Sequence, residues 1–492
     1  MSATLALYHR LPAWARSAVA TARGAQLRWL RYGPETSRLV EQAMEREYWS
    51  PSQWRHWEQE RLLRVLHRAA TRVPYYRRLW EARRRAGDYR SWEYLENWPL
   101  LEGETLRREP LAFLADDRRP SWMVPDHTSG TSGRPLHLWR SRRTLRARYA
   151  LYEARHRLWY GVSRRDRWAM LGGQLVVPFR QSKPPFWTWN AAMRQLYVSS
   201  YHLSPEFSPA ILEALARYRI RYLWGYPSSL HALATAALAN GVRTTMRVAI
   251  ANAEPVYERH RQAVRAAFGC ALRETYGMVE LVAAAGECEF GGLHAFPEMG
   301  CMEIFDAGVP AEGSRAGDLV CTSLLDDDMP LIRYRLGDRA ARRDLQGPCA
   351  CGRTLPLLDH VEGRADDVLY TMDGRRIGRL DPVFKNNLPI REAQIVQLSL
   401  ARVVVRFAPA PDYTPAAGAS IRKALEARLG PIEVALEPVD CIPRGPNGKF
   451  RAVVCQIPHS ERPPFRDAAI AAGDPIPTRE GGVHDWAAIK RG

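Results

Sequence analysis

The segment that decides the fold spans residues 221–277 and reads RYLWGYPSSLHALATAALANGVRTTMRVAIANAEPVYERHRQAVRAAFGCALRETYG. Three short apolar runs in it alternate with two helical stretches, and Gly241 and Gly269 directly follow these stretches. Glycine is favoured just past the end of a helix because it adopts positive φ without strain. Strands that alternate with helices in this way are typical of βαβ units. We therefore predict an α/β fold with a mainly parallel sheet covered by helices on both faces.

The first 100 residues predict a mainly helical region. Ser50 is a candidate N-cap, and Pro51 follows it at the first helical position. Apolar side chains then recur at helical spacing, and the Val73-Pro74 pair predicts the end of this helix. Nearer the amino terminus, one face of a basic helix collects the apolar residues Leu11, Trp14, Ala18, Ala22, Ala25 and Trp29. This helix either packs on its own domain, which a tryptophan stripe favours, or makes a peripheral membrane contact.

The composition changes near residue 365, which suggests a domain boundary. Beyond it, VVVRF (403–407) and AVVCQI (452–457) are strand candidates that flank the helical stretch at 418–430, as in a small α+β domain. The tail after Pro458 is rich in proline and charge, so we expect it to be poorly ordered. The predicted division is therefore a large domain at 1–365, a small domain at 366–457 and a tail at 458–492.

Composition and charge limit the class of protein. The 46% hydrophobic content of the 492 residues is ordinary for a soluble globular protein, and no apolar run reaches the roughly 18 residues of a membrane span. Scattered cysteines without a secreted spacing favour the cytoplasm. The 71 Lys+Arg against 53 Asp+Glu give a net charge of +18, which suits anionic partners such as nucleotides, coenzymes, lipid headgroups or nucleic acid. A generally solvated surface is the other explanation of this charge.

The stretch HTSGTSGRP (127–135) has the composition of an anion-binding loop. Its glycines, Gly130 and Gly133, allow positive φ and a close backbone approach to a ligand. Its hydroxyl side chains and consecutive N–H groups would form a nest for phosphate. The stretch does not match a Walker A loop, and a flexible polar turn is the alternative interpretation.

Four residues in two segments suggest a metal site. Cys288 and His294 lie in CEFGGLH, and Cys349 and Cys351 lie in PCACGR. Three thiolates and one imidazole are a complete tetrahedral set for a structural Zn²⁺. Reduced cysteines with a core histidine are the alternative. The remaining cysteines lie in apolar, strand-like contexts and are expected in the core: Cys270, Cys301, Cys321, Cys441 and Cys455.

Six short motifs occur in a fixed order along the chain: SGTSGRP, NAEP, ETYGMVE, RYRLGD, GRADD and PRGPNGK. In this order they resemble the adenylate-forming superfamily of acyl-CoA synthetases. The resemblance is greatest to the phenylacetate–CoA ligase branch and its relatives in polysaccharide clusters, and it covers about residues 50 to 457. It implies the adenylate-forming enzyme fold, in which a small mobile C-terminal domain covers a large ATP- and acid-binding domain. Some members of this branch also carry a structural zinc.

The resemblance implies a nucleotide site built from the first five motifs. The loop that holds the ATP phosphates corresponds to Ser129, Gly130, Thr131, Ser132 and Gly133, and Arg134 replaces the usual lysine. NAEP, with Ala253 and Glu254, and ETYG, with Thr275, Tyr276 and Gly277, would wrap the adenine, and Tyr276 would stack on the base. Glu280 corresponds to the carboxylate on the Mg²⁺ side, Asp338 to the ribose ligand, and Arg364 to an arginine that reaches ribose or phosphate.

The same resemblance implies the chemistry. Lys449 would bridge the acyl carboxylate and the α-phosphate, and the small domain would rotate about Asp366. We therefore expect ATP-dependent activation of a small-molecule carboxylic acid through an acyl-adenylate, with transfer to coenzyme A and with no nucleic acid as partner. An amine or a carrier thiol is the alternative acceptor, and a non-catalytic membrane- or polyanion-associated protein is the alternative of another class.

The sequence suggests only a general character for the acid. Aromatic residues are concentrated in segments expected near the pocket, namely Phe186, Trp187, Trp189, Trp224 and Tyr226. Aromatic side chains often line apolar ligand pockets, which indicates an aryl or apolar acid. Packing of these residues in the core is the other interpretation.

Overall fold

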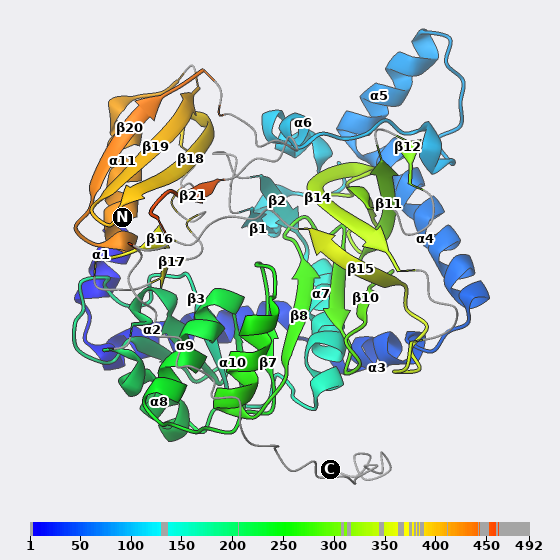
Figure 1. Cartoon of the computed structure of the whole chain (residues 1–492). Helices are drawn as coiled ribbons and strands as arrows, with labels where there is room; N and C mark the ends of the chain where they lie inside the picture. Colours follow the sequence, from blue (N-terminus) through cyan, green and yellow to red (C-terminus); the bar gives the residue numbers. More distant parts are fainter. Residues whose placement is uncertain are drawn as a thin grey trace.

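The computed structural model describes residues 3–128, 136–204, 206–306, 309–311, 316–343, 349–362, 369–372, 376–377, 380, 383, 388–410, 412–440, 442, 452–458 and 461. This part of the chain forms a 13-stranded sheet, a four-stranded sheet and two two-stranded sheets, with helices packed around them (Figure 1). None of the described helices combines the length and the apolar character that a membrane span requires.

The amino-terminal part is helical, as predicted. It contains α1 (Ala3–Arg10), α2 (Ala13–Arg31), α3 (Thr36–Arg46), α4 (Pro51–Arg72) and α5 (Pro74–Arg85). The Ser50 side chain accepts a hydrogen bond from the backbone N–H of Gln53 at 3.3 Å. The Gln53 side chain in turn accepts one from the backbone N–H of Ser50, which completes a capping box. The predicted N-cap of α4 and its end before Pro74 are both confirmed.

Helix α2 packs through a different face from the one that its tryptophans suggested. The helix packs on its own domain, as predicted, but Trp14 and Trp29 are 76% and 57% exposed, so the tryptophan stripe is not the packed face. A neighbouring face contacts β4 (Trp187–Asn190), where the backbone N–H of Trp189 donates to Ser17 Oγ at 3.3 Å. At Gly24 an added Cβ would lie only 2.0 Å from Asn190, so glycine permits this close approach. Polar and small residues thus form the contact.

The centre of the main sheet is parallel. The full strand order is β12-β11-β13-β14-β15-β10-β9-β8-β7-β6-β3-β5-β4. The parallel pairs involve β5 (Gln195–Ser199), β3 (Trp168–Gly172), β6 (Tyr222–Gly225), β7 (Ala249–Ala251) and β8 (Leu272–Gly277). Helices α9 (Pro227–Ala239) and α10 (Glu258–Phe268) connect the last three strands, which confirms the predicted βαβαβ unit. Gly241 and Gly269 have φ of +64° and +61°, as their positions predicted.

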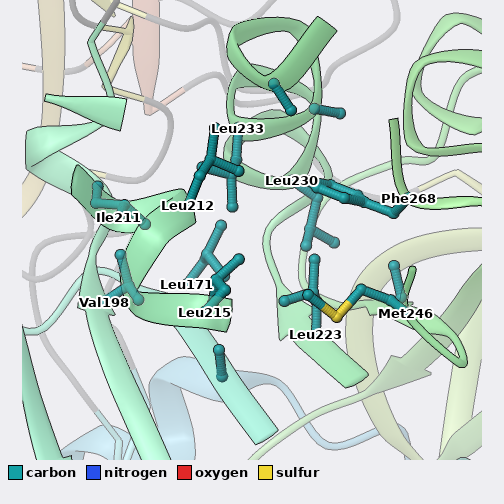
Figure 2. Close-up of a cluster of buried hydrophobic side chains, with 14 of the residues drawn as sticks. Leu171, Val198, Ile211, Leu212, Leu215, Leu223, Leu230, Leu233, Met246 and Phe268 are labelled. Carbon is teal, nitrogen blue, oxygen red and sulfur yellow. The ribbon is translucent and has the colours of Figure 1, made fainter. Parts of the chain in front are cut away.

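Alternate side chains of this parallel centre face two cores. Leu171 and Leu223 point into a cluster that α8 (Ser208–Arg217), α9 and α10 cover (Figure 2). Trp168, Tyr222 and Ile250 point to the other face. Continuous apolar strands are expected where a parallel sheet is buried on both faces.

Antiparallel strands extend the sheet on the side of β8. They are β9 (Ala284–Glu287), β10 (Leu293–Ala295), β11 (Gly300–Asp306), β12 (Val309–Pro310), β13 (Gly317–Ser323), β14 (Tyr334–Arg342) and β15 (Leu357–Glu362). On the other side, β4 pairs antiparallel with β5. The parallel pairing is therefore confined to the centre.

The carboxyl-terminal part has its own four-stranded sheet and core. Its elements are β16 (Leu369–Tyr370), β17 (Arg376–Ile377), β18 (Ile390–Ser399), β19 (Arg402–Pro409), α11 (Pro415–Leu429), β20 (Glu433–Pro438) and β21 (Val453–Cys455). The core of this part also includes Phe179 and Tyr201 from the large part of the chain. At Gly430 a Cβ would lie 2.8 Å from Phe179. The predicted strands and helix are confirmed, whereas the domain division stays a prediction, and the tail beyond Glu461 lies outside the described residues.

A fully buried ion pair joins the hairpin of β1 (Val124–His127) and β2 (His137–Arg140) to the rest of the protein. Nε of Arg140, the last residue of β2, lies 2.8 Å from Oδ2 of Asp326, and both side chains are 0% exposed. Asp326 also accepts a hydrogen bond from the backbone N–H of Asp328 at 2.9 Å. Arg140 therefore fixes the end of the hairpin against the loop between β13 and β14.

We expect Arg140→Met to destabilise the protein by roughly 3–5 kcal/mol, because Asp326 would remain buried without its cation. Urea-induced unfolding followed by intrinsic fluorescence measures this loss. The double variant Arg140→Met/Asp326→Leu should recover part of it, and Arg55→Met, at an exposed position of α4, is the control. An Arg140→Met protein as stable as the control would contradict the role of the pair.

A half-buried carboxylate predicts a pH-dependent stability. Burial, followed by the charge of Glu287, raises the pKa of Glu274 to about 7. The folded protein therefore retains a proton that the unfolded chain releases above its pKa of about 4.3, so stability falls as the pH rises from about 4.3 to about 7. We expect Glu274→Gln to remove up to about 3 kcal/mol of this decline, measured as the free energy of unfolding at pH 5 and pH 7.5. An unchanged slope, or the same change in the exposed Glu258→Gln control, would argue against this assignment.

Candidate active site

The carboxyl ends of the central parallel strands carry two of the predicted motifs. Strand β7 ends at Ala251 and leads into Asn252-Ala253-Glu254, and β8 ends with Thr275-Tyr276-Gly277. Ligands of open α/β sheets bind at such edges. The structure therefore brings both motifs to the edge where the sequence placed them.

The turn after β7 has an unusual backbone conformation. Ala253 has a backbone φ of +68°, a value that residues other than glycine rarely adopt. The backbone N–H of Asn252 donates to Gly225 O at 3.1 Å, and Glu254 Oε2 accepts a bond from the backbone N–H of Ser228 at 3.1 Å. A carboxylate at the first turn of α9 is favoured by the helix dipole. Glu254 thus holds the turn against α9.

Tyr276 and Asp338 form a hydrogen bond between distant strands. The Tyr276 hydroxyl donates to Asp338 Oδ2 at 2.8 Å. Their strands, β8 and β14, are separated by three others in the sheet, which would place them about 19 Å apart in a flat sheet. Burial, followed by the charge of Asp338, raises the pKa of Tyr276 well above its usual value, so the phenol remains a donor. Curvature of the sheet therefore brings together two residues that the sequence assigned to one nucleotide.

Thr275 and Glu280 flank this pair. Thr275 is buried, and its hydroxyl donates to Ala251 O at 2.7 Å, which ties β8 to β7. The side chain of Glu280 is half-buried, and its backbone carbonyl accepts a bond from Arg140 Nη2 at 3.1 Å. Arg140 thereby positions the segment that carries Glu280. Sequence reasoning missed Arg140, because nothing local distinguishes it among the many arginines.

Several predicted residues lie outside the described residues. They are Ser129, Gly130, Thr131, Ser132, Gly133, Arg134, Arg364, Asp366 and Lys449. The flanks of the predicted phosphate loop are described: Leu136 N donates to Thr128 Oγ1 at 2.9 Å, and Thr128 N donates to Leu136 O at 3.1 Å. These bonds extend the β1–β2 hairpin by one residue pair, so Thr128 and Leu136, which flank the loop, are held next to each other.

The predicted aromatic residues divide between core and site edge. Phe186 and Trp187 lie in the core under α8, where the rings of Phe186 and Phe207 contact each other in a tilted arrangement, which agrees with the core-packing interpretation. Trp224 lies in the core on the other face of the sheet. Of these aromatic residues, only Tyr226, directly after β6, remains at the carboxyl edge.

Two further tyrosines at this edge were not anticipated. A Cβ at Gly172 would lie 2.2 Å from the Tyr197 hydroxyl, and one at Gly173 would lie 3.2 Å from that of Tyr201 and 3.4 Å from that of Tyr226. Tyr201 donates a hydrogen bond to Gly173 O at 2.8 Å. Three phenol oxygens thus surround the glycine pair at the end of β3, and this pair was the available signal in the sequence.

The four predicted metal ligands lie together. One ligand atom from each of Cys288, His294, Cys349 and Cys351 lies within 4.8 Å of the others. The Cys288 and Cys349 sulfurs are 3.8 Å apart, and Cys351 Sγ is 3.3 Å from His294 Nε2. Burial raises the pKa of Cys288 to about 12, so the free thiol would stay protonated and a bound cation would have to displace the proton.

Groups around this cluster orient its ligands. His294 Nδ1 lies 3.0 Å from Leu355 O, which leaves Nε2 for the centre of the cluster. Arg353 bridges the cluster to Glu47, at the end of α3, through a bond of 3.0 Å. The cluster thereby joins the β9–β10 loop to the segment before β15 and to the helical region.

Comparisons with known proteins agree with this geometry. Residues 93–316 match the AMP-binding enzyme family, and residues 369–456 match the CapK C-terminal domain family. Protein CapK of Staphylococcus aureus is 24% identical over 353 residues, which cover 69% of this chain and 76% of that protein. A phenylacetate-coenzyme A ligase of Thermus thermophilus is 27% identical over 341 residues, which cover 63% of this chain and 70% of that enzyme.

A solved structure shows the same fold. A crystal structure of 2-hydroxyisobutyryl-CoA ligase in complex with 2-HIB-AMP and CoA, in the thioesterification state, aligns with a TM-score of 0.53 and 20% identity, over 83% of this chain and 91% of that chain. The predicted fold is therefore confirmed. The AMP-binding match and the sequence relatives support the predicted adenylate-forming superfamily of AMP-forming ligases, with phenylacetate–coenzyme A ligases among the proteins that this chain is similar to.

Proposed function

We propose that this ligase activates a carboxylic acid as its acyl-adenylate at the carboxyl edge of the sheet and transfers the acyl group to coenzyme A. The hydrogen bond between Tyr276 and Asp338 carries the proposal, because it joins the expected base-stacking ring to the expected ribose carboxylate. The CoA ligases among the relatives and the solved structures support the thiol acceptor. An amine or a carrier thiol remains the second candidate acceptor.

The nucleotide is proposed to lie across the ends of β7, β8 and β14. The turn at Ala253 and the ring of Tyr276 would enclose the adenine, and the Asp338 carboxylate would accept hydrogen bonds from the ribose hydroxyls. Because the Tyr276 hydroxyl already donates to Asp338, base and ribose ligands would move as one unit. Arg364 would reach the ribose or a phosphate.

The first half-reaction joins two anions, so its barrier is largely electrostatic. The acid carboxylate attacks the α-phosphorus, the bond from that phosphorus to the bridging oxygen breaks, and pyrophosphate leaves. The N–H groups of the loop at 129–133, with the Thr131 hydroxyl, would bind the leaving phosphates. Lys449 would pair with the carboxylate and the reacting phosphate. Mg²⁺, when bound near Glu280, neutralises phosphate charge.

The second half-reaction needs a different arrangement of the small lobe. Rotation about Asp366 would withdraw Lys449 and admit the thiol, because a hinge needs only a few residues that absorb the change in φ and ψ. The thiolate sulfur then attacks the acyl carbon and AMP leaves. The core that Phe179 and Tyr201 share with the carboxyl-terminal sheet supports a contact that such a rotation would rearrange.

The acid is proposed to carry a polar group near its carboxylate. The three phenol oxygens around Gly172 and Gly173 lie beside the strand ends that would receive the acid. ATP–pyrophosphate exchange over a panel of carboxylic acids, including phenylacetate and short hydroxy acids, tests both the activity and this preference. Exchange with no acid in the panel would count against the proposed function.

We expect Lys449→Ala to lower the rate of acid-dependent ATP–pyrophosphate exchange by at least about 100-fold, because a positioned charge in such a site contributes roughly 3 kcal/mol to the transition state. ATP affinity, measured by calorimetry, should change less than threefold. Lys423→Ala, at an exposed position of α11, removes the same charge from the same lobe and should leave the rate unchanged. Equal rates in the two variants would remove Lys449 from the mechanism.

We infer that the cluster of Cys288, His294, Cys349 and Cys351 binds a structural Zn²⁺. Three thiols and one imidazole nitrogen within 4.8 Å of one another fit its preferred tetrahedral ligand set. Since all four positions would come from the protein, the ion would hold loops together and would take no part in the reaction.

Metal analysis of the purified protein should find about one zinc per chain, and Cys351→Ser should lose most of it. We expect removal of the zinc by a chelator to lower the unfolding temperature by at least about 5 °C, because the loops at 288–294 and 349–355 would lose their common anchor. Cys301→Ser, outside the cluster, is the matched control. Zinc content that stays unchanged in Cys351→Ser would refute the site.

A further inference from the structure

A cavity of about 730 Å³ lies at the amino ends of the parallel strands. Trp168, the first residue of β3, and Arg194, directly before β5, line it. The candidate active site lies at the carboxyl ends of the same strands, so the cavity is on the opposite edge of the sheet. Its guanidinium groups come from four segments of the chain: Arg28, Arg157, Arg164, Arg165 and Arg194.

The cavity has a strong excess of positive charge. Its lining, among the described residues, contains five arginines and neither aspartate nor glutamate. One buried carboxylate behind it, Glu153, lies 3.5 Å from Arg157 Nη1 and 3.3 Å from Arg164 Nη1. Because one carboxylate is shared by two arginines, most of the positive charge of the five guanidinium groups remains available to a ligand.

Arg157 is fixed before any ligand arrives. It is 5% exposed, its guanidinium lies 4.7 Å from the ring centre of Trp224 and 5.5 Å from that of Trp168, and Nε donates to the Tyr222 hydroxyl at 2.9 Å. Its Nη1 makes no hydrogen bond within the described part of the chain. Nη1 lies 3.5 Å from Glu153, so an ion pair and the two tryptophan rings hold this buried guanidinium at the back of the cavity.

The other arginines continue from this buried group to the surface. Arg164 lies 5.1 Å from the ring centre of Tyr32 and is half-buried, whereas Arg28, Arg165 and Arg194 are exposed. Trp29, 57% exposed, stands beside Arg28 in the cavity lining. A phosphate-bearing molecule can therefore contact guanidinium groups along its length and a ring near the opening.

We propose that this cavity binds a small ligand that carries phosphate groups next to a planar or sugar ring. The planar fork of arginine matches phosphate oxygens in bidentate pairs, and aromatic side chains contact flat rings. The volume is within the usual range for small-molecule sites. A soluble nucleoside or sugar diphosphate offers both the phosphates and the ring, whereas the headgroup of an anionic phospholipid such as phosphatidylglycerol offers the phosphate alone.

Two probes separate these sources on the full-length protein. Uridine 5′-diphosphate is titrated by calorimetry, and phosphatidylglycerol vesicles are compared with phosphatidylcholine vesicles by co-sedimentation. The variant Arg28→Glu/Arg165→Glu reverses two exposed charges of the cavity. Arg55→Glu/Arg84→Glu makes the same charge change at exposed positions of α4 and α5 and serves as the control.

We expect the cavity variant to bind the preferred probe at least about tenfold more weakly, because charge-assisted hydrogen bonds are lost, while the control stays within twofold. Loss confined to uridine diphosphate identifies a soluble ligand, and loss confined to the vesicles identifies a lipid headgroup. Both variants should retain the unfolding temperature and the acid-dependent exchange rate, so this test is independent of the proposed function. An equal loss in both variants, retained binding in the cavity variant, or no binding of either probe to the wild type overturns the proposal.

Discussion

The buried pair of Arg140 and Asp326 is the constraint on which the candidate active site depends. Burying two charges is costly, and a well-packed apolar pair is often at least as stable, so stability alone does not explain the pair. The pair instead fixes the position of the two segments that carry it, because each buried charge is stable only next to the opposite charge of its partner. Arg140 holds the hairpin that leads into the predicted phosphate loop, and it also hydrogen-bonds the backbone of Glu280, the expected carboxylate on the metal side. One side chain therefore sets the distance between the two elements that would handle the phosphates.

Local sequence was sufficient for the central part of the fold. The segment from residue 221 to 277 contains whole strands and helices, and Gly241 and Gly269 mark the helix ends through their own backbone preference. Once these strands were recognised as parallel, their carboxyl ends had to share an edge, so the positions of Ala253 and Tyr276 followed. The capping box at Ser50 was predictable for the same reason, since every interaction lies within one turn of helix.

Contacts between distant segments were not accessible in this way. Asp338 reaches Tyr276 only because several antiparallel strands curve the sheet, and that pairing leaves no short-range pattern. The packed face of helix α2 could not be predicted for a related reason: it is set by the close approach of β4 at Gly24, not by the apolar stripe of the helix. The cysteines and the histidine of the cluster were found because they are chemically rare, whereas Arg140 is one arginine among many.

The same contrast explains the positive charge of the chain. A net charge of +18 is compatible with a solvated surface or with an anionic partner, and composition cannot separate the two. The structure distributes the charge unevenly. Many arginines pair with carboxylates, as Arg155 does with Glu298 at 2.7 Å, and such pairs attract no ligand. At the amino ends of β3 and β5, by contrast, arginines from separate segments meet around one shared carboxylate, Glu153. An excess that is diffuse in the sequence thus becomes local, and a local excess that lines a cavity can select a ligand.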